Sequence, residues 1–212
     1  MLKNTLLTLS LTLAVALGGN LAQGATITNI SDSPANVSPI LPGLVLPQVS
    51  LKSADNKEVS LHTLLEQKPT ILVVYRGGWC PYCSQQLANI KKIEQELIDK
   101  GFQIIAVSPD SPEKLQQSTI SSANYQLLSD DQLKLTQALG LAFYLDDEVA
   151  KAYRNKLGVN FVTLDGEQKV ALPVPAVFVL DTDARVHFQY ANPNYKMRLS
   201  EQLLLAAADA VQ

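Results

Sequence analysis

Three mainly apolar runs, rich in β-branched residues, predict buried strands over residues 70–75, 102–107 and 176–180. An apolar run of this length without alternation is typical of a strand covered on both faces of a sheet. Shorter or alternating patterns predict further strands. These are a hairpin of 49–52 and 59–61 around a turn at 55–57, a strand at 125–128, a loop or small hairpin over 161–170, and a strand at 185–190 that pairs antiparallel with 176–180.

Apolar residues at helical spacing lie between these strands. Residues 81–100 place Leu87, Ile90 and Leu97 on one face, begin at a proline suited to a first turn, and end before a glycine. Alternating strands and helices, followed by a hairpin and a helix, predict an α/β fold, a sandwich with a central mixed β-sheet flanked by helices and an N-terminal β-hairpin extension. Further helices are predicted at 112–121, 130–139, 146–157 and 199–211, with a short helical turn at 62–66.

The first 46 residues differ in composition from the rest. Lys3, an uncharged apolar run at 6–17 and the small residues around 22–25 predict a signal peptide over residues 1–24, with an uncleaved anchor as the alternative. We therefore expect an exported protein, periplasmic or extracellular, with no stable membrane span after cleavage. Residues 25–46 are rich in Ser, Asn and Pro and predict an extended tether. The domain itself is expected over 47–212.

Charge and histidine content narrow the function classes. The 212 residues carry a net charge of −3 without a basic patch interleaved with aromatics, so we expect no nucleic-acid partner. The two histidines, His62 and His187, lack finger-like spacing to the cysteines, so no metal site is predicted. We also expect no organic cofactor.

Cys80 and Cys83 are the only cysteines of the chain. They follow a buried strand and a Gly-Gly break and precede a helix, which places two thiols where the helix dipole stabilises a thiolate. A disulfide between them closes a very short loop and stabilises the fold little, so a purely structural bridge is the weaker interpretation. The motif predicts thiol redox chemistry.

Four stretches together resemble the peroxiredoxin-like family of the thioredoxin superfold, related to alkyl hydroperoxide reductase and thiol-specific antioxidant proteins. The similarity runs from about Leu46 to the C-terminus. It implies antioxidant activity against peroxides through Cys80 and Cys83, and re-reduction by a thioredoxin-type electron donor. The stretches are residues 73–83, 104–114, 127–131 and 173–181.

The chain departs from that family at three positions. The resemblance places Cys83 at the peroxide-attacking position and Cys80 where the family has a Thr. Arg76 stands where it has a Pro, and Pro175 where it has an Arg. The hydroxyl and guanidinium that such proteins use to bind the peroxide are therefore missing from their usual places.

Other features resemble thioredoxins. Trp79 precedes the first cysteine, and Val174-Pro175 resembles the cis-proline pair that faces it, so a cis peptide is expected there. Pro81 and Tyr82 lie between the cysteines, and we expect Tyr82 to line the substrate surface. Trp79 either packs across the site or is a plain packing residue.

Three charged or aromatic residues outside the C-x-x-C pair are further candidates for the site. Arg76 either lowers a thiol pKa or is a solvated charge at a strand end. Tyr195 and Arg198, in the last connection, are candidates to reach the site. The connection 141–174 is long, and we expect its helix to flank the site and shape access.

Two reaction cycles fit the cysteine pair. In a peroxidase cycle one cysteine becomes a sulfenic acid and the other captures it as a disulfide. In an exchange cycle Cys80 attacks a protein disulfide and Cys83 resolves the mixed disulfide. The sequence leaves open which oxidant is used and which sulfur attacks first. A redox-inactive binding module is a third, weaker interpretation.

Overall fold

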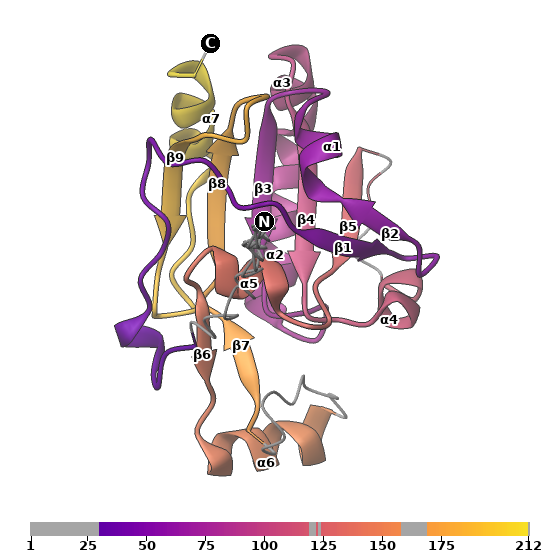
Figure 1. Ribbon diagram of the computed structural model, residues 1–212, viewed down its shortest axis with the longest axis vertical. Coiled ribbons are helices and arrows are strands. Elements are labelled where there is room, and N and C mark those ends of the chain that lie inside the picture. The colour runs from indigo at the N-terminus through magenta and orange to yellow at the C-terminus, as the bar shows by residue number, and fades with distance from the viewer. Residues whose placement is uncertain (1–29, 119–121, 123, 158–168, 212) are drawn as a thin grey trace, which may run out of the picture.

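The computed structural model describes residues 30–118, 122, 124–157 and 169–211. Its centre is a seven-stranded mixed sheet with the order β2-β1-β5-β4-β3-β8-β9. The three middle strands β3, β4 and β5 run parallel, and the neighbours on either side are antiparallel (Figure 1). The strands of this sheet are β1 (Ser50–Ser53), β2 (Glu58–Ser60), β3 (Thr70–Val74), β4 (Gln103–Ser108), β5 (Tyr125–Ser129), β8 (Ala176–Leu180) and β9 (Val186–Ala191). The predicted mixed sheet and N-terminal hairpin are confirmed.

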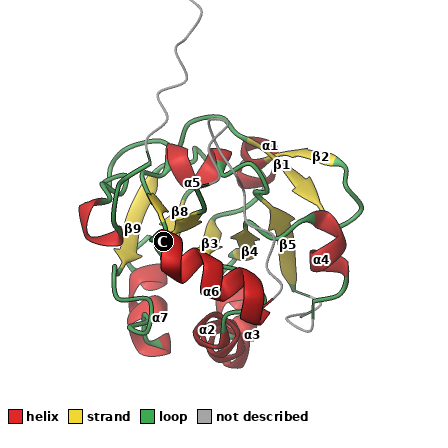
Figure 2. Ribbon diagram, turned by 90° about the horizontal axis from the view of Figure 1, so that it is seen from below, coloured by secondary structure: helices red, strands yellow, loops and turns green. Residues whose placement is uncertain are grey.

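Helices cover both faces of the sheet. Figure 2 shows α2, α3 and α7 on one side of the strands and α1 and α5 on the other. The helices are α1 (Leu61–Leu65), α2 (Pro81–Lys92), α3 (Glu94–Asp99), α4 (Pro112–Gln116), α5 (Lys134–Ala138), α6 (Asp147–Leu157) and α7 (Glu201–Asp209), with a short 3-10 turn at Pro34–Asn36. The predicted α/β sandwich is therefore observed.

The alternation of side chains along β3 explains the two cores. Ile71 and Val73 belong to the apolar cluster under α2, α3 and α7, whereas Leu72 and Val74 belong to the cluster under α1 and α5. Successive strand residues point to opposite faces, so a strand with helices on both faces must be apolar at every position. All five residues of β3 are buried, as the unbroken apolar run predicts.

Several helices are shorter than their sequence patterns predict. The predicted helix over 81–100 is divided at Ile93, whose N–H donates to the oxygen of Ile90 in a tighter, i to i−3 turn. The predicted helix over 130–139 begins only at Lys134, because the buried carboxylate of Asp130 accepts the backbone N–H groups of Leu135 and Thr136. Asp130 thus caps the helix from outside instead of belonging to it. The predicted helix over 112–121 is observed only over the five residues of α4, which ends at Gln116; residues 119–121 lie outside the described part.

A separate two-stranded ribbon, β6 (Ala142–Tyr144) and β7 (Ala171–Pro173), carries α6 at its end. Figure 1 shows this unit extending from one end of the sheet, next to the start of α2. It confirms the helix predicted over 146–157. The predicted loop or hairpin over 161–170 lies mostly outside the described residues.

The segment predicted as a tether is described over residues 30–46, where it is irregular apart from the 3-10 turn Pro34–Asn36, and it is packed on the domain. Ser38 donates its backbone N–H to the oxygen of Gly140, and Leu46 donates to the oxygen of Ala184. The Leu46 side chain is buried in the core. Side-chain composition predicted the extended form, but these backbone hydrogen bonds fix its course.

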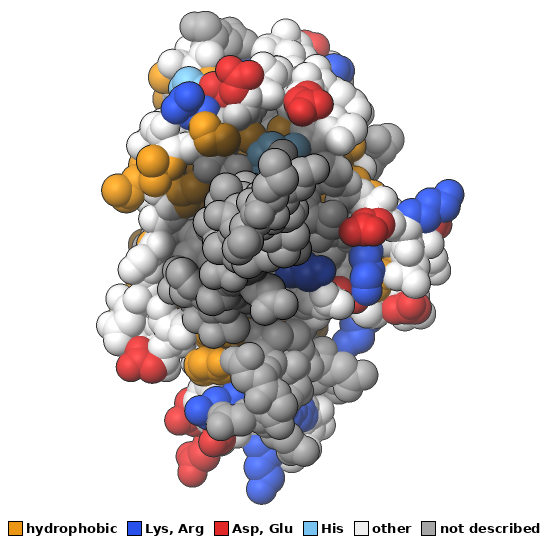
Figure 3. Space-filling view, viewed as in Figure 1, with side chains coloured by type: hydrophobic (Ala, Val, Ile, Leu, Met, Phe, Trp, Pro, Cys, Tyr) orange, Lys and Arg blue, Asp and Glu red, His pale blue; other side chains and the backbone are white. Residues whose placement is uncertain are grey.

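No helix within the described ranges is long and apolar enough to cross a membrane. On the face shown in Figure 3, acidic and basic side chains of the described residues are interspersed, without an extended surface of one sign.

Candidate active site

The two cysteines lie where the central strand β3 passes into helix α2. Cys80 is the N-cap of α2 and Pro81 its first residue, as the sequence predicts. The Cys80 carbonyl accepts the N–H groups of Cys83 and Ser84, at 3.0 and 3.1 Å. Pro81 has no N–H to leave unpaired at that first position. Both sulfurs are therefore carried by the first turn of a 12-residue helix whose amide dipoles stabilise negative charge.

A carboxylate from the neighbouring strand shapes the loop before the cysteines. Asp110, just after β4, accepts a hydrogen bond from the Gly78 N–H at 2.7 Å and from the Ser108 hydroxyl at 3.1 Å. Gly77 has a φ of +135°, and a Cβ there would lie 2.4 Å from Nε1 of Trp79 and 2.9 Å from Asp110. Sequence reasoning missed Asp110. Its position in the sequence could have indicated its role. Asp110 follows β4, and the carboxyl ends of the parallel strands β3 and β4 lie at the same edge of the sheet, where the cysteine loop begins.

Both thiols are buried, Cys80 as well as Cys83. Cys80 is 1% exposed and Cys83 is fully buried. Trp79 packs against the apolar cluster that contains both cysteines and so helps to exclude water from them. Local sequence position could not show this, because the covering side chains come from other parts of the chain. The two cysteines are free thiols.

The sulfurs share their protons unequally. The pKa of Cys80 is lowered to about 6, mainly because the Cys83 thiol donates a hydrogen bond to its sulfur. Burial opposes this effect and raises the pKa. The backbone N–H of Cys83 and the positive charges of Arg76 and Arg198 lower it further. The pKa of Cys83 is raised, because it donates to Cys80 and is itself buried. At neutral pH the pair therefore carries one negative charge, centred on Cys80.

Arg198, in the connection between β9 and α7, brings a guanidinium to this pair. Its Nη2 donates to Sγ of Cys83 over 3.4 Å, and its Nη1 donates to Oε1 of the buried Gln86 over 2.9 Å. Gln86 lies one turn after Cys83 on α2 and holds the guanidinium in place. The expectation that Arg198 reaches the site is confirmed.

Arg76 lies at the start of the cysteine loop and is 4% exposed, so the solvated-charge interpretation is wrong. Its guanidinium carbon lies 4.4 Å from the ring centroid of Tyr195, 5.2 Å from that of Trp79 and 5.6 Å from that of Tyr153. Each such contact contributes about 0.5–2 kcal/mol and offsets part of the cost of burying a charge. Arg76 thereby contacts Tyr195 and Trp79, two residues that the sequence places at the site. It also contacts Tyr153, which the sequence did not indicate.

Tyr82 is 39% exposed, and its ring meets that of Tyr195 edge to face with centroids 5.6 Å apart. It therefore presents an accessible aromatic surface between the two cysteines. Its role in lining the substrate surface stays a prediction.

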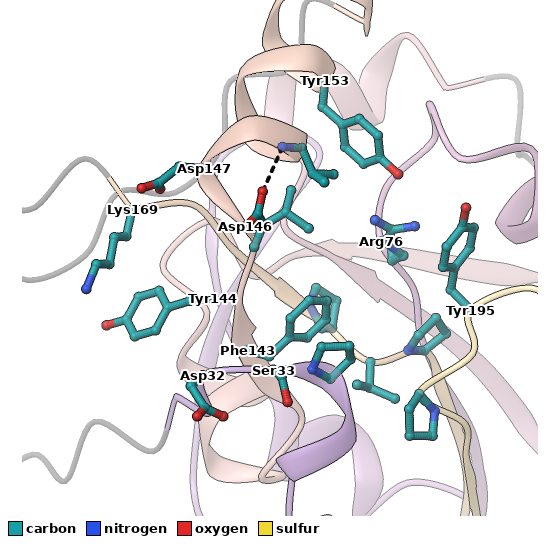
Figure 4. A pocket seen from close by; sticks show the side chains of 17 residues that line it. Asp32, Ser33, Arg76, Phe143, Tyr144, Asp146, Asp147, Tyr153, Lys169 and Tyr195 are labelled. Atoms are coloured by element: carbon teal, nitrogen blue, oxygen red, sulfur yellow. Dashed lines mark hydrogen bonds between the residues drawn. The ribbon is translucent and has the colours of Figure 1, made fainter.

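A cavity of about 640 Å³ lies beside the cysteine loop, and Figure 4 shows Arg76 between Tyr153 and Tyr195 at one side of it. Val174 and Pro175 line the same cavity. Tyr153 belongs to α6, and its ring meets that of Trp79 at a centroid distance of 5.4 Å. The expectation that the helix of the long connection flanks the site is confirmed.

The expected cis peptide at Val174-Pro175 is wrong, since no peptide bond of the described residues is cis. Val174 donates its N–H to the oxygen of Leu141, which continues the β6–β7 pairing, and β8 starts directly after Pro175. The chain thus runs extended from β7 into β8, and an extended course suits the trans form that X–Pro bonds prefer.

No group of three or more potential metal-ligating side chains occurs within the described ranges. His187 Nε2 lies 2.7 Å from Oδ2 of Asp181 at the β8–β9 turn, and His62 belongs to α1. Neither position provides a ligand beside the cysteines.

Residues 42–189 match the sequence profile of the AhpC/TSA family. The chain belongs to this family. Peroxiredoxin Bcp of Escherichia coli K12 is 26% identical over 106 residues, which make up 50% of this chain and 67% of that protein. Peroxidoxin BcpB of Mycobacterium tuberculosis superposes with a TM-score of 0.58 at 18% identity, over 81% of this chain and 97% of that one. Reduced Prx3 of Vibrio vulnificus in complex with hydrogen peroxide superposes with a TM-score of 0.61 at 19% identity, over 80% of this chain and 99% of that one.

The predicted family is thereby confirmed, and the chain is a thiol-based oxidoreductase of the peroxiredoxin type. The structure shows which groups lie beside the cysteines at the positions where the chain departs from the family pattern. Pro175 occupies the expected arginine position, but Arg198 brings a guanidinium to Cys83 from another connection. Where the family has a threonine, Cys80 brings a second sulfur next to the first.

Proposed function

We propose that this AhpC/TSA-family protein reduces hydroperoxides with Cys80 as the attacking sulfur and Cys83 as the resolving one. The proposal rests on the position of Cys80 at the N-cap of α2, where the Cys83 thiol donates a hydrogen bond to its sulfur and lowers its pKa to about 6. A thiolate attacks peroxides and a thiol does not, so at neutral pH Cys80 is the prepared nucleophile. The family resemblance alone favours Cys83, but its raised pKa keeps that sulfur protonated.

The first step transfers one oxygen. The Cys80 thiolate attacks the distal oxygen of the hydroperoxide, the O–O bond breaks, and the products are a Cys80 sulfenic acid and an alkoxide, or hydroxide from hydrogen peroxide. A proton from the medium or from the Cys83 thiol neutralises the leaving oxygen. The guanidinium of Arg198, held by Gln86 next to the sulfurs, stabilises negative charge in this step.

The second step forms the disulfide. The Cys83 sulfur attacks the Cys80 sulfenic sulfur, and water leaves with the hydroxyl oxygen and one proton. The pair is then oxidised by two electrons overall. A dithiol donor of the thioredoxin type returns the electrons by exchange through a mixed disulfide and is itself oxidised. Tyr82, exposed between the cysteines, is the surface we assign to contact with that donor.

Peroxide as the oxidant is supported by the family and by its relatives. Reduced Prx3 of Vibrio vulnificus, a structural neighbour, binds hydrogen peroxide. Exchange with protein disulfides is the second candidate, but the thioredoxin-like cis-proline that favoured it is absent. Thiol loss in reduced protein with hydrogen peroxide, and separately with an oxidised protein disulfide, separates the two. Thiol loss with the disulfide alone would overturn the peroxidase proposal.

Single cysteine variants test the order of attack. We expect Cys83→Ser to react with peroxide and to accumulate a sulfenic acid trapped by dimedone at Cys80, because the serine hydroxyl can still donate a hydrogen bond. Cys80→Ser should react roughly 100-fold more slowly at pH 7, since a thiol with a pKa two units above the pH is about 1% ionised. Equal rates in the two variants, measured by stopped flow, would refute Cys80 as the nucleophile.

We also propose export, on the strength of the apolar run at 6–17 and the small residues that follow it. Expression of the full chain and separation of periplasm from cytosol tests this. The expected product is shorter than the full chain and begins near residue 25. Full-length protein confined to the cytosol would contradict the proposal.

A further inference from the structure

The cavity beside the cysteine loop has apolar walls. Prolines and hydrocarbon side chains from four parts of the chain surround it, and it has about 640 Å³ of space (Figure 4). A pocket of this size and composition is typical of a site for a small organic ligand. The apolar residues used here are Phe143, Leu145, Val149, Pro173, Val174 and Pro175.

One side of this cavity holds a buried cation without a carboxylate partner. Arg76 lines the cavity and is 96% buried, and within the described ranges no carboxylate forms an ion pair with it. Its Nε is buried and has no hydrogen-bond partner. Rings of Trp79, Tyr153 and Tyr195 lie against the guanidinium, but rings accept no in-plane hydrogen bonds of ordinary strength. Buried charges and polar groups in proteins are normally paired, so a partner is missing.

The rest of the cavity limits what that partner can be. Asp32, Asp146 and Asp147 line its other side and disfavour a ligand with several negative charges. Lys169, also at that side, lies over the ring of Tyr144 at 5.4 Å. A small hydrated anion would leave the apolar walls uncovered. A ligand with one planar anionic group and a hydrocarbon body fits both features. The anionic group can accept hydrogen bonds from the Arg76 guanidinium, and the hydrocarbon body can cover the apolar walls.

We propose that this cavity binds an aliphatic monocarboxylate, with the carboxylate on the Arg76 guanidinium and the hydrocarbon chain against the apolar walls. This goes beyond peroxide reduction and requires no reaction at sulfur. The site is separate from the cysteines, which do not line the cavity.

Calorimetric titration of the reduced full chain with octanoate, and with 1-octanol as the uncharged probe of equal chain length, tests the proposal. We expect octanoate to bind roughly tenfold or more tightly than octanol, as a charged hydrogen-bonded pair would provide. Arg76→Met should remove this preference. Lys169→Met, the matched loss of the other cation of the cavity, should retain it.

Further variants keep the test decisive if Arg76→Met does not fold. Val149→Trp fills the cavity from α6 while Arg76 stays in place, and it should abolish binding of both probes. Leu203→Trp, at an exposed position of α7, serves as its control and should bind octanoate like the unaltered chain.

Several results would overturn the proposal. They are equal affinity for octanoate and octanol, no binding of octanoate, tighter binding of inorganic phosphate, loss of the preference in Lys169→Met alone, or octanoate binding retained in Val149→Trp.

Discussion

Nη2 of Arg198 donates a hydrogen bond to Sγ of Cys83 over 3.4 Å, although the two residues are 115 positions apart in the chain. The Arg198 side chain is in turn anchored on Gln86, one helical turn beyond Cys83. The contact supplies positive charge to a buried pair of thiols. It also explains how the chain keeps a guanidinium at the sulfurs when Pro175 occupies the position expected for it.

Removing this guanidinium should slow the reaction with peroxide. In Arg198→Met we expect the pKa of Cys80 to rise, because one of the charges that lower it is lost. The second-order rate constant for hydrogen peroxide at pH 6 should fall roughly fivefold if the pKa rises by about one unit, because the ionised fraction of Cys80 then decreases from about one half to about one tenth. Stopped-flow tryptophan fluorescence measures it.

Arg198→Lys is the matched control for that variant. The lysine keeps the positive charge but not the paired donors to Cys83 and Gln86. The rate constant of Arg198→Lys with hydrogen peroxide should therefore lie between those of Arg198→Met and the unaltered protein. An Arg198→Met protein that folds, as judged by thermal unfolding, and reacts at the unaltered rate would show that Arg198 is not part of the site.

The reactivity of Cys80 should follow a low pKa. Its rate of alkylation by iodoacetamide should be nearly constant above pH 7 and decrease as the pH falls through about 6, because the thiolate is protonated there. Cys83→Ala removes the hydrogen-bond donor that is the main cause of the shift, so its midpoint should lie at higher pH than in Cys83→Ser. A midpoint between 8 and 9 in the unaltered protein would contradict the shared proton.

Gly77 should tolerate no side chain. In Gly77→Ala the new Cβ would collide with Trp79 and with Asp110, which holds the cysteine loop, at a φ of +135° that an alanine adopts only under strain. We expect a loss of about 2–4 kcal/mol in the free energy of unfolding and slower peroxide reduction. Urea denaturation and the peroxide assay measure the two effects.

Gly43→Ala provides the control for steric contact. Gly43 also has a positive φ, +91°, but a Cβ there meets nothing within 4 Å. It should cost only about 1 kcal/mol, the strain of the backbone alone, and leave the peroxide rate unchanged. If both variants lose the same stability, contact with Trp79 and Asp110 is not the reason.

Asp130 should make the fold less stable as the pH rises from about 4 to 6. Burial raises its pKa from 3.8 to about 6, against the effect of the hydrogen bonds it accepts from Thr136 and neighbouring backbone groups. In that range the folded chain holds a proton that the unfolded chain has lost, so the free energy of unfolding decreases with pH, by about 3 kcal/mol at most. Urea denaturation at pH 4.0 and 6.5 measures the change.

The variant Asp130→Asn should lose this part of the pH dependence, whatever its overall stability. Asp131→Asn, at the adjacent residue paired with Lys52, should retain it. An unchanged slope in Asp130→Asn would assign the pH dependence to other groups.

Sequence patterns were most reliable where one physical requirement decided the local structure. The apolar run at 176–180 coincides with β8, because a strand covered on both faces admits few polar residues. Patterns failed where a hydrogen bond outside the regular helices and strands decided the course of the chain. The carboxylate of Asp130 delays the start of α5, and the backbone of Gly140 pairs with the extended segment at Ser38.

The sequence alone determined the chemistry of this protein. A C-x-x-C pair after an apolar strand and a Gly-Gly break, with Cys80 directly before the Pro81 that starts a helix, is enough to place two thiols at a helix N-terminus, since strand, turn and helix start are local properties. The tertiary structure decided the environment of those thiols. Burial of both sulfurs, the contact from Arg198 and the aromatic surroundings of Arg76 depend on which distant segments pack together, and no local pattern specifies that packing.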